Sequence, residues 1–381
     1  MAGTLRVVVF VLGAAVVALT MGSVVRTVVL PRALLSSLNR FTFMAMRVVF
    51  RTVSGNRERD FARWDRINAS YAPVSLLALL MVWLILITAG YTAIFWALGD
   101  DGPREAFVLS GSSLLTLGFA RRDDLPSVLA AFSEAAIGLL VLALLIGYLP
   151  TIYGAFTRRE LFIAKLEVRA GSPPTGVELL SRAWRIGRLD RLADLWVQTE
   201  SWFSDIEESH TSNPAVSFFR SPQPDHSWVT GAGAGLDAAS LLESSVVDEG
   251  GLESRLAIRS GYIALRRIAL FFGAPVPVDP QYGDPISITR AEYDDALRSL
   301  EAAGVPIVAD RDQAWRDFAG WRVNYDMALV SLAGMTGAPY APWSSDRANF
   351  GSRKGFLGRN ARRDRRAAAA RQRDKERLGS I

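Results

Sequence analysis

Residues 74–98 read VSLLALLMVWLILITAGYTAIFWAL and contain no charged side chain. They lie within an uncharged stretch of 33 residues that covers positions 67–99. About 20 apolar residues in a helix cross a hydrocarbon core about 30 Å thick, so this stretch is long enough to span a membrane. A second uncharged stretch of 23 residues, 135–157, ends in aromatic residues of the kind found at membrane interfaces. The sequence therefore predicts two membrane-spanning helices.

The first 30 residues contain another apolar run, 19 residues between Arg6 and Arg26. It has two interpretations, an uncleaved third span or a secretory signal peptide. The run is long for the apolar region of a signal peptide, and no small-x-small cleavage site precedes Arg26, which favours the span. The next segment, 31–53, carries arginines at helical spacing in an apolar background: Arg40, Arg47 and Arg51. It suits a helix in the membrane interface, although a hairpin with the first run is an alternative.

The distribution of arginine predicts the orientation. Positions 26–66 contain nine arginines, whereas the connection between the two confident spans has three arginines and five acids. Cytoplasmic loops carry the excess of positive charge. We therefore expect a multi-pass protein of the plasma membrane, with loop 26–66 and everything after 158 in the cytoplasm and connection 99–127 outside.

That outward connection contains a second kind of apolar segment, AFVLSGSSLLTLGFA at 106–120. As a helix, these 15 residues reach only about 22 Å at about 1.5 Å per residue, which is too short to cross. An apolar segment of this length is more often re-entrant, interfacial or buried. Irregular backbone at membrane depth needs surrounding protein or a water-filled cavity. A hydroxyl, a glycine and an aromatic residue in the second half of the segment are typical of such backbone.

Residues 74–157 resemble the two-span, one-pore potassium channel module over their whole length. That family has a filter sequence T-V-G-Y-G-D or T-I-G-F-G, and this chain has T-L-G-F-A-R. The resemblance implies a filter whose carbonyl oxygens face the ion in four copies, formed by Thr116, Leu117, Gly118, Phe119 and Ala120. It also implies an inner-helix hinge at Gly138 or Gly147. The implied outer mouth consists of Arg121, Arg122, Asp123 and Asp124.

Two departures from the family bear on selectivity. Ala120 stands where the family has a glycine in the left-handed conformation, and a Cβ there costs roughly 1–2 kcal/mol. Arg121 stands where the family has an acid, and positive charge opposes the field that concentrates cations unless Asp123 and Asp124 offset it. A pore is therefore better supported than potassium selectivity. The alternative for the TLGFA segment is a loop that packs against two helices of a membrane anchor.

After Arg158 the sequence predicts a cytoplasmic helical domain. A Ser-Pro-Pro sequence indicates a linker at 170–175, and apolar residues recur at helical spacing over 176–206. Thr289 and Glu292 form a capping-box pattern, and Asp310 can cap a further helix. The last segment is basic and low in large apolar residues, which predicts a disordered tail with weak attraction to anionic lipid headgroups.

No catalytic constellation is recognisable, so we do not expect an enzyme. The chain has no cysteine and only two histidines, too few for a three-histidine zinc site. The glycine-rich segment 231–235 matches nucleotide-binding fingerprints poorly. Surface or core histidines are favoured over a metal site built from Glu207, Glu208, His210, Asp225 and His226. We expect no metal, no cofactor and no nucleic-acid partner.

The sequence thus predicts an all-α membrane protein with two or three transmembrane helices, a re-entrant pore helix with a filter-like loop, and a cytoplasmic helical domain. We expect an ion channel for monovalent cations, with potassium favoured, in a homo-oligomer that is most simply a tetramer. The alternative is a non-conducting membrane-anchored scaffold or sensor. The expected segments are 1–30, 31–70, 71–157 with the re-entrant loop 106–120, 158–345 and 346–381.

Overall fold

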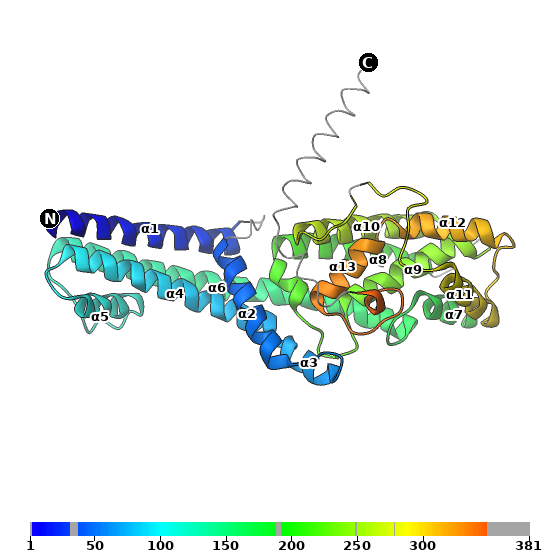
Figure 1. Ribbon diagram of the computed structural model, residues 1–381, viewed down its shortest axis with the longest axis horizontal. Coiled ribbons are helices and arrows are strands. Elements are labelled where there is room, and N and C mark those ends of the chain that lie inside the picture. Colours follow the sequence, from blue (N-terminus) through cyan, green and yellow to red (C-terminus); the bar gives the residue numbers. More distant parts are fainter. Residues whose placement is uncertain (1, 31–36, 188–191, 248–249, 278, 349–381) are drawn as a thin grey trace, which may run out of the picture. The chain divides into compact units, whose positions relative to one another are not determined.

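The computed structural model (Figure 1) describes residues 2–30, 37–187, 192–247, 250–277 and 279–348. The chain forms two compact units. The first comprises the chain up to Gly154 together with Ser212–Phe219, and the second comprises Ala155–Thr211 and the chain from Arg220 onward. Most of the predicted tail lies outside the described residues.

Helices make up the regular structure of both units. No strand forms among the described residues, where the β contact is an isolated antiparallel bridge between Val246 and Ile307. The predicted all-α class is therefore confirmed.

The first unit is built from six helices, the last of which continues into the second unit: α1 (Ala2–Val28), α2 (Ser37–Ser54), α3 (Phe61–Ala69), α4 (Tyr71–Leu98), α5 (Pro103–Leu114) and α6 (Leu125–Ala170). Three described helical stretches are long and apolar enough to cross a membrane: Gly3–Val28, Phe61–Leu98 and Leu125–Ala170. By length and composition these helices agree with the predicted membrane protein, and the N-terminal run is one of the three candidate spans.

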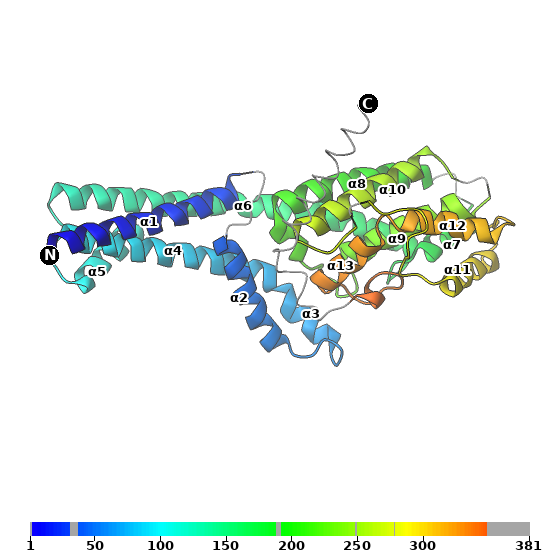
Figure 2. The same ribbon diagram turned by 45° about the horizontal axis from the view of Figure 1, so that its top comes forward.

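Close packing joins α1 to α4, which lie side by side in Figures 1 and 2. A Cβ atom on Gly13 would lie 2.5 Å from the carbonyl oxygen of Gly90, and one on Gly90 would lie 2.7 Å from Cγ2 of Val17. Such distances allow hydrogen but no larger substituent at either glycine. Small residues let membrane helices approach closely in this way.

Buried polar contacts also connect α1 with α4 and α2. Nε1 of Trp83 donates to Oγ of Ser23 at 3.2 Å, and Ser23 Oγ in turn donates to Oδ1 of Asn39 at 3.1 Å. Nδ2 of Asn39 donates to Oγ1 of Thr27 at 2.5 Å. Because polar groups in an apolar interior need partners, this chain of bonds fixes the mutual position of three helices.

The second unit contains the end of α6, seven further helices and a short 3-10 helix: α7 (Gly176–Arg185), α8 (Leu192–Ser212), α9 (Trp228–Ser245), α10 (Leu252–Phe271), α11 (Arg290–Ala302), α12 (Arg311–Arg322), α13 (Asp326–Thr336) and η3 (Ser345–Arg347). Another 3-10 helix, η2 (Pro214–Phe218), belongs to the first unit. Helix α9 is the centre of the second unit, because 17 of its 18 residues are buried and α7, α10, α12 and α13 pack on it.

The glycine-rich segment 231–235 lies inside α9 and serves packing. A Cβ on Gly231 would lie 2.5 Å from Cδ1 of Ile163, and one on Gly233 would lie 3.0 Å from Cδ2 of Leu329. Glycine lowers helix propensity by about 1 kcal/mol relative to alanine, but here it admits neighbouring side chains at close range.

The helix predicted over 176–206 is interrupted. Helix α7 ends at Arg185, and Gly187 adopts a φ of +62°. Positions 188–191 lie outside the described residues, and α8 begins at Leu192. A positive φ is incompatible with a continuing right-handed helix, so the glycine ends the first one.

The predicted capping signals are confirmed. Thr289 N donates to Oε2 of Glu292 at 2.8 Å, and Glu292 N donates to Oγ1 of Thr289 at 3.3 Å. Oδ1 of Asp310 accepts a hydrogen bond from the backbone N–H of Gln313 at 2.9 Å. Each cap satisfies a donor at a helix start, as expected from the sequence.

A buried charge cluster holds the core of the second unit together. Arg322 is fully buried, donates to Oδ1 of Asp326 at 2.8 Å and to the carbonyl oxygen of Trp343 at 2.5 Å, and also pairs with Asp237. Burial disfavours the guanidinium charge, but the two aspartates outweigh it and raise the pKa of Arg322 above its ordinary value. Arg322 therefore stays charged in the core.

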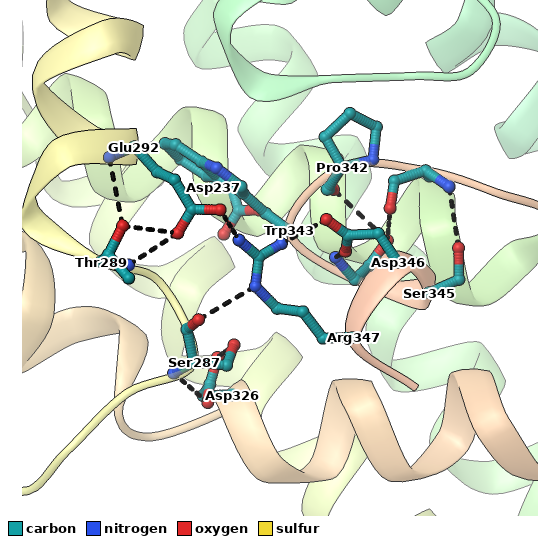
Figure 3. A network of polar contacts seen from close by, with 12 residues as sticks. Asp237, Ser287, Thr289, Glu292, Asp326, Pro342, Trp343, Ser345, Asp346 and Arg347 are labelled. Atoms are coloured by element: carbon teal, nitrogen blue, oxygen red, sulfur yellow. Dashed lines mark hydrogen bonds and ion pairs between the residues drawn. The ribbon is translucent and has the colours of Figure 1, made fainter. Parts of the chain in front are cut away.

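The segment that ends the described chain is fastened next to this cluster (Figure 3). Nε of Arg347 donates to the carbonyl oxygen of Ser287 at 2.9 Å, and its guanidinium also pairs with Glu292 and Asp346. Ser287 donates through Oγ to Oδ1 of Asp326 at 2.6 Å. The packed unit thus extends past 345, the boundary expected from the sequence, to include Arg347.

Candidate functional site

The candidate site lies at the end of α5, between α4 and α6. Helix α5 starts with Pro103 and has Glu105 in its first turn, both typical of a helix start. Its C-terminal end approaches α6 closely, since a Cβ on Gly138 would lie 2.6 Å from the carbonyl oxygen of Leu114. The loop that follows α5 carries the predicted filter residues.

The first residues of this loop form a helix-terminating turn. The backbone N–H of Leu117 donates to the carbonyl oxygen of Ser112 at 2.8 Å. The backbone N–H of Thr116 donates to the carbonyl oxygen of Ser113 at 3.0 Å. These two bonds define a Schellman motif, whose left-handed position is usually glycine. Here Thr116 occupies it with a φ of +54°. A β-branched residue in this conformation is strained by about 1–2 kcal/mol.

The second half of the loop folds back onto Ser112. Oγ of Ser112 accepts a hydrogen bond from the backbone N–H of Ala120 at 3.0 Å. Gly118 adopts a φ of +73°, whereas Ala120 does not have a positive φ. The expectation of left-handed strain at Ala120 is therefore wrong, because the turn places the left-handed residues at Thr116 and Gly118.

The loop exposes apolar side chains and contains carbonyl groups that accept no hydrogen bond from the described residues. Leu117 is 60% exposed and Phe119 is 70% exposed. Within the described part of the chain, the carbonyl oxygens of residues 116–119 accept no hydrogen bond. One copy of the chain therefore leaves both the apolar side chains and the carbonyls of this loop available to a neighbour, to lipid or to an ion.

The predicted outer-mouth residues divide into two groups. Nη1 of Arg122 donates to the carbonyl oxygen of Phe95 at 2.7 Å and Nε to Oδ2 of Asp101 at 3.0 Å. Asp124 caps α6 by accepting from the backbone N–H of Ser127 at 3.0 Å. These two charges thus fasten helix ends. The other group remains exposed on the surface and forms a loose pair, Arg121 and Asp123, 3.7 Å apart.

Glu134 is a site residue that the sequence reasoning missed. It lies on α6, is fully buried, and accepts a hydrogen bond at Oε1 from Oγ of Ser110 on α5 at 2.5 Å. The available signal was an acid beside a long uncharged stretch, since ionisable residues in membrane segments usually have a specific role. Glu134 therefore ties the short helix to the long one at Ser110, in the part of the chain just before the loop.

The two glycines predicted as a hinge have different surroundings. Gly138 is packed against Leu114, as described above, whereas a Cβ on Gly147 would meet no atom within 4 Å. Helix α6 continues without interruption through both positions. Pro150 lies inside the helix and cannot donate the bond to the residue four positions earlier, which makes it a further candidate for bending.

The histidines and acids of the second unit lie in separate contacts. His210 is fully buried, with Nε2 3.4 Å from Nη1 of Arg159 and Nδ1 3.1 Å from Oγ of Ser209. Burial, together with the charge of Arg159, holds the pKa of His210 well below its ordinary value. Nε2 of His226 lies 2.6 Å from Oε2 of Glu167. Across the described ranges, no three side chains of the metal-binding types converge.

Comparisons with protein-family models, with curated proteins and with solved structures found no match for this chain.

Proposed function

We propose that the chain forms an ion channel, in which the loop after α5 lines a pore for monovalent cations. The observation that carries this proposal is a short helix, α5, between two candidate spans, followed by a turn with positive φ at Thr116 and Gly118. The strained backbone at Thr116 supports the proposal, because strained residues cluster at functional sites. In the proposed pore the carbonyl oxygens of residues 116–119, which accept no hydrogen bond among the described residues, replace part of the hydration shell of the ion.

A homo-oligomer follows from the same geometry. One loop cannot surround an ion, so the proposed pore requires a ring of copies, most simply a tetramer. The exposed side chains of Leu117 and Phe119 support this arrangement, because neighbouring copies would cover them. In the proposed orientation, the arginine-rich segment 26–66 and the second unit lie in the cytoplasm of a cell whose plasma membrane holds the spans.

The charges near the loop are less opposed to cations than the sequence indicates. Arg122 is paired with Asp101 and donates a hydrogen bond to the carbonyl oxygen of Phe95 in the last turn of α4. Its charge is therefore partly neutralised. Arg121 faces the nearby acid Asp123. The proposed entry therefore carries little net positive charge, which supports conduction of cations but does not distinguish potassium from sodium.

A non-conducting scaffold or sensor is the second candidate. It rests on the observation that hydrogen bonds from the turn to the carbonyl oxygens of Ser112 and Ser113 close it, so its conformation is held by the chain itself. In this case the three spans would only anchor the packed second unit, and the loop would end α5 and do nothing else.

Ion flux into liposomes distinguishes the two candidates. The purified full chain is reconstituted, and fluxes of potassium, sodium and chloride are compared for the wild type, Gly118→Ala and Thr116→Ala. We expect cation flux that both substitutions reduce by tenfold or more per folded oligomer. A Cβ on Gly118 would meet no atom within 4 Å, so a loss there would reflect the backbone and not a clash. Folded, oligomeric protein without flux under any gradient or voltage would contradict the channel.

A further inference from the structure

Helix α2 has an outward apolar stripe that no described part of the chain covers. Phe41 is 71% exposed, Met44 is 36% exposed and Val48 is 64% exposed. Their spacing of three and four residues places them on one face of the helix. An apolar stripe of this kind on a surface helix calls for an apolar partner.

Arginines border this stripe along one edge. Arg47 and Arg51 are exposed and Arg40 is half-buried, and each lies three or four residues from Met44 or Val48. Helix α2 contains no acidic residue, and none occurs anywhere in residues 27–57. We call the six residues together the α2 outer surface: Phe41, Met44, Val48, Arg40, Arg47 and Arg51.

The opposite face of α2 is fixed to the first unit. Tyr71 donates from its hydroxyl group to the carbonyl oxygen of Phe43 at 3.1 Å, and its ring meets the edges of Phe43 and Phe50. Asn39 is bonded to α1 through Ser23 and Thr27. These contacts prevent α2 from turning its outer surface inward.

The position of α2 along the spans is also defined. It packs beside Tyr71, the first residue of α4, and beside Thr27 in the last turn of α1. From there it runs obliquely away from the direction of both helices (Figure 2). The uncharged stretch of the candidate span that contains α4 begins at residue 67, close to Tyr71 in the sequence. Ends of spans lie at the level of the lipid headgroups, so we place the start of α2 near that level.

We propose that the α2 outer surface binds anionic phospholipid. The guanidinium groups contact the phosphates of the headgroups, and acyl chains cover Phe41, Met44 and Val48. Amphipathic helices with a basic edge lie in the membrane interface in this manner, and each basic residue near the surface increases the affinity for anionic lipid about fivefold. The inference is independent of ion conduction, because it uses only α2 and its neighbours.

The absence of cysteine from the chain allows a direct test. A single Val48→Cys substitution in the full protein accepts one fluorescent label on the outer surface. The protein is reconstituted into vesicles of phosphatidylcholine and phosphatidylglycerol in which only one of the two lipids is brominated. We expect brominated phosphatidylglycerol to quench the label several-fold more than brominated phosphatidylcholine at equal mole fraction. Inorganic phosphate should leave this preference unchanged, which separates a lipid site from a general phosphate site.

The arginines are then removed in the labelled protein. Arg47→Gln with Arg51→Gln should reduce the preference for phosphatidylglycerol at least about fivefold. The matched control is the double variant Arg298→Gln with Arg316→Gln, at exposed positions in the second unit. This control should leave the preference for phosphatidylglycerol unchanged. Labelling at Ala45, exposed on the same helix, gives an independent probe if Val48→Cys fails to fold. Equal quenching by the two lipids, or a preference that survives loss of both arginines, would overturn the proposal.

Discussion

Ser110 on α5 donates a hydrogen bond to the buried carboxyl group of Glu134 on α6, with 2.5 Å between the oxygens. The second carboxyl oxygen, Oε2, is buried without a partner among the described residues. A serine hydroxyl has a single proton to donate, and the carbonyl oxygen of Thr88 is a competing acceptor at 3.2 Å. The hydrogen-bonded link between α5 and Glu134 therefore depends on one side chain.

Ser110→Ala should destabilise the first unit. The substitution leaves both oxygens of Glu134 buried without a donor, which costs about 1–3 kcal/mol. Ser113→Ala on the same helix is the matched control, because the hydroxyl group of Ser113 bonds, among the described residues, only the carbonyl oxygen of Leu109, one turn earlier in α5. We expect a lower unfolding temperature in detergent for Ser110→Ala and a change within about 0.5 kcal/mol for the control. Equal losses in the two variants would show that the Glu134 contact adds nothing.

Thr116→Gly and Gly118→Ala should change stability in opposite directions. Glycine removes the strain of a positive φ at Thr116, whereas alanine adds it at Gly118, each by about 1 kcal/mol. The space around Gly118 is open, so the free-energy cost of Gly118→Ala is purely conformational. Thermal unfolding of the two variants and the wild type should give a higher unfolding temperature for Thr116→Gly and a lower one for Gly118→Ala. Destabilisation by Thr116→Gly would mean that its side chain contributes more than the strain it bears.

The spans could be predicted from the sequence, but the loop geometry could not. An uncharged run longer than 20 residues has few alternatives to a membrane helix, which is why the helices around 74–98 and 135–157 were recognisable. The turn at Thr116 depends on where α5 ends, because Leu117 bonds a residue five positions back, and ends of helices are the least readable feature of a sequence. The strain was expected at Ala120 because the resembled family has a left-handed glycine at that position.

Long-range contacts account for the other gaps. The bond from Arg122 to the carbonyl of Phe95 joins residues 27 positions apart, and no local pattern indicates it. Residues 231–235 are rich in glycine, and their low helix propensity gave no indication of a helix. Tertiary packing nevertheless stabilises α9 at these positions. Gly187, by contrast, was a readable signal for the break between α7 and α8.

Gly13→Val should separate α1 from α4. A Cβ at this position would lie 2.5 Å from the carbonyl oxygen of Gly90, and backbone cannot move aside easily. Gly22→Val on the same helix is the control, because no atom lies within 4 Å of the corresponding Cβ. We expect a clear drop in unfolding temperature for Gly13→Val and none for the control.

The same helix also tests the signal-peptide interpretation. Measurement of the intact mass should find residues 2–28 retained in the wild type. Cleavage before α2 would restore the signal-peptide interpretation.

His210 should make stability depend on pH. Burial holds its pKa in the folded state well below 6.5, the value of the unfolded chain, so the unfolded state binds a proton first as the pH falls. The stabilising contribution is complete above about pH 6.5 and is lost as the pH falls towards the folded-state pKa, by up to about 1.4 kcal/mol per pH unit. His210→Gln should flatten this part of a plot of unfolding temperature against pH. An unchanged slope in the variant would assign the dependence to other groups.

Arg322→Leu should be the most damaging single substitution in the second unit. It would leave Asp237 and Asp326 buried side by side without a counter-charge, and removing one member of a buried ion pair typically costs about 3–5 kcal/mol. Arg316→Leu, exposed on the same helix, controls for the loss of an arginine from α12. Limited proteolysis of the full protein should find the second unit cleaved rapidly only in Arg322→Leu. If Arg322→Leu combined with Asp237→Asn and Asp326→Asn recovered stability, the cost would lie in the unpaired carboxylates. An equally unstable triple variant would assign it to the lost bond to the Trp343 carbonyl, which holds the segment leading to Arg347.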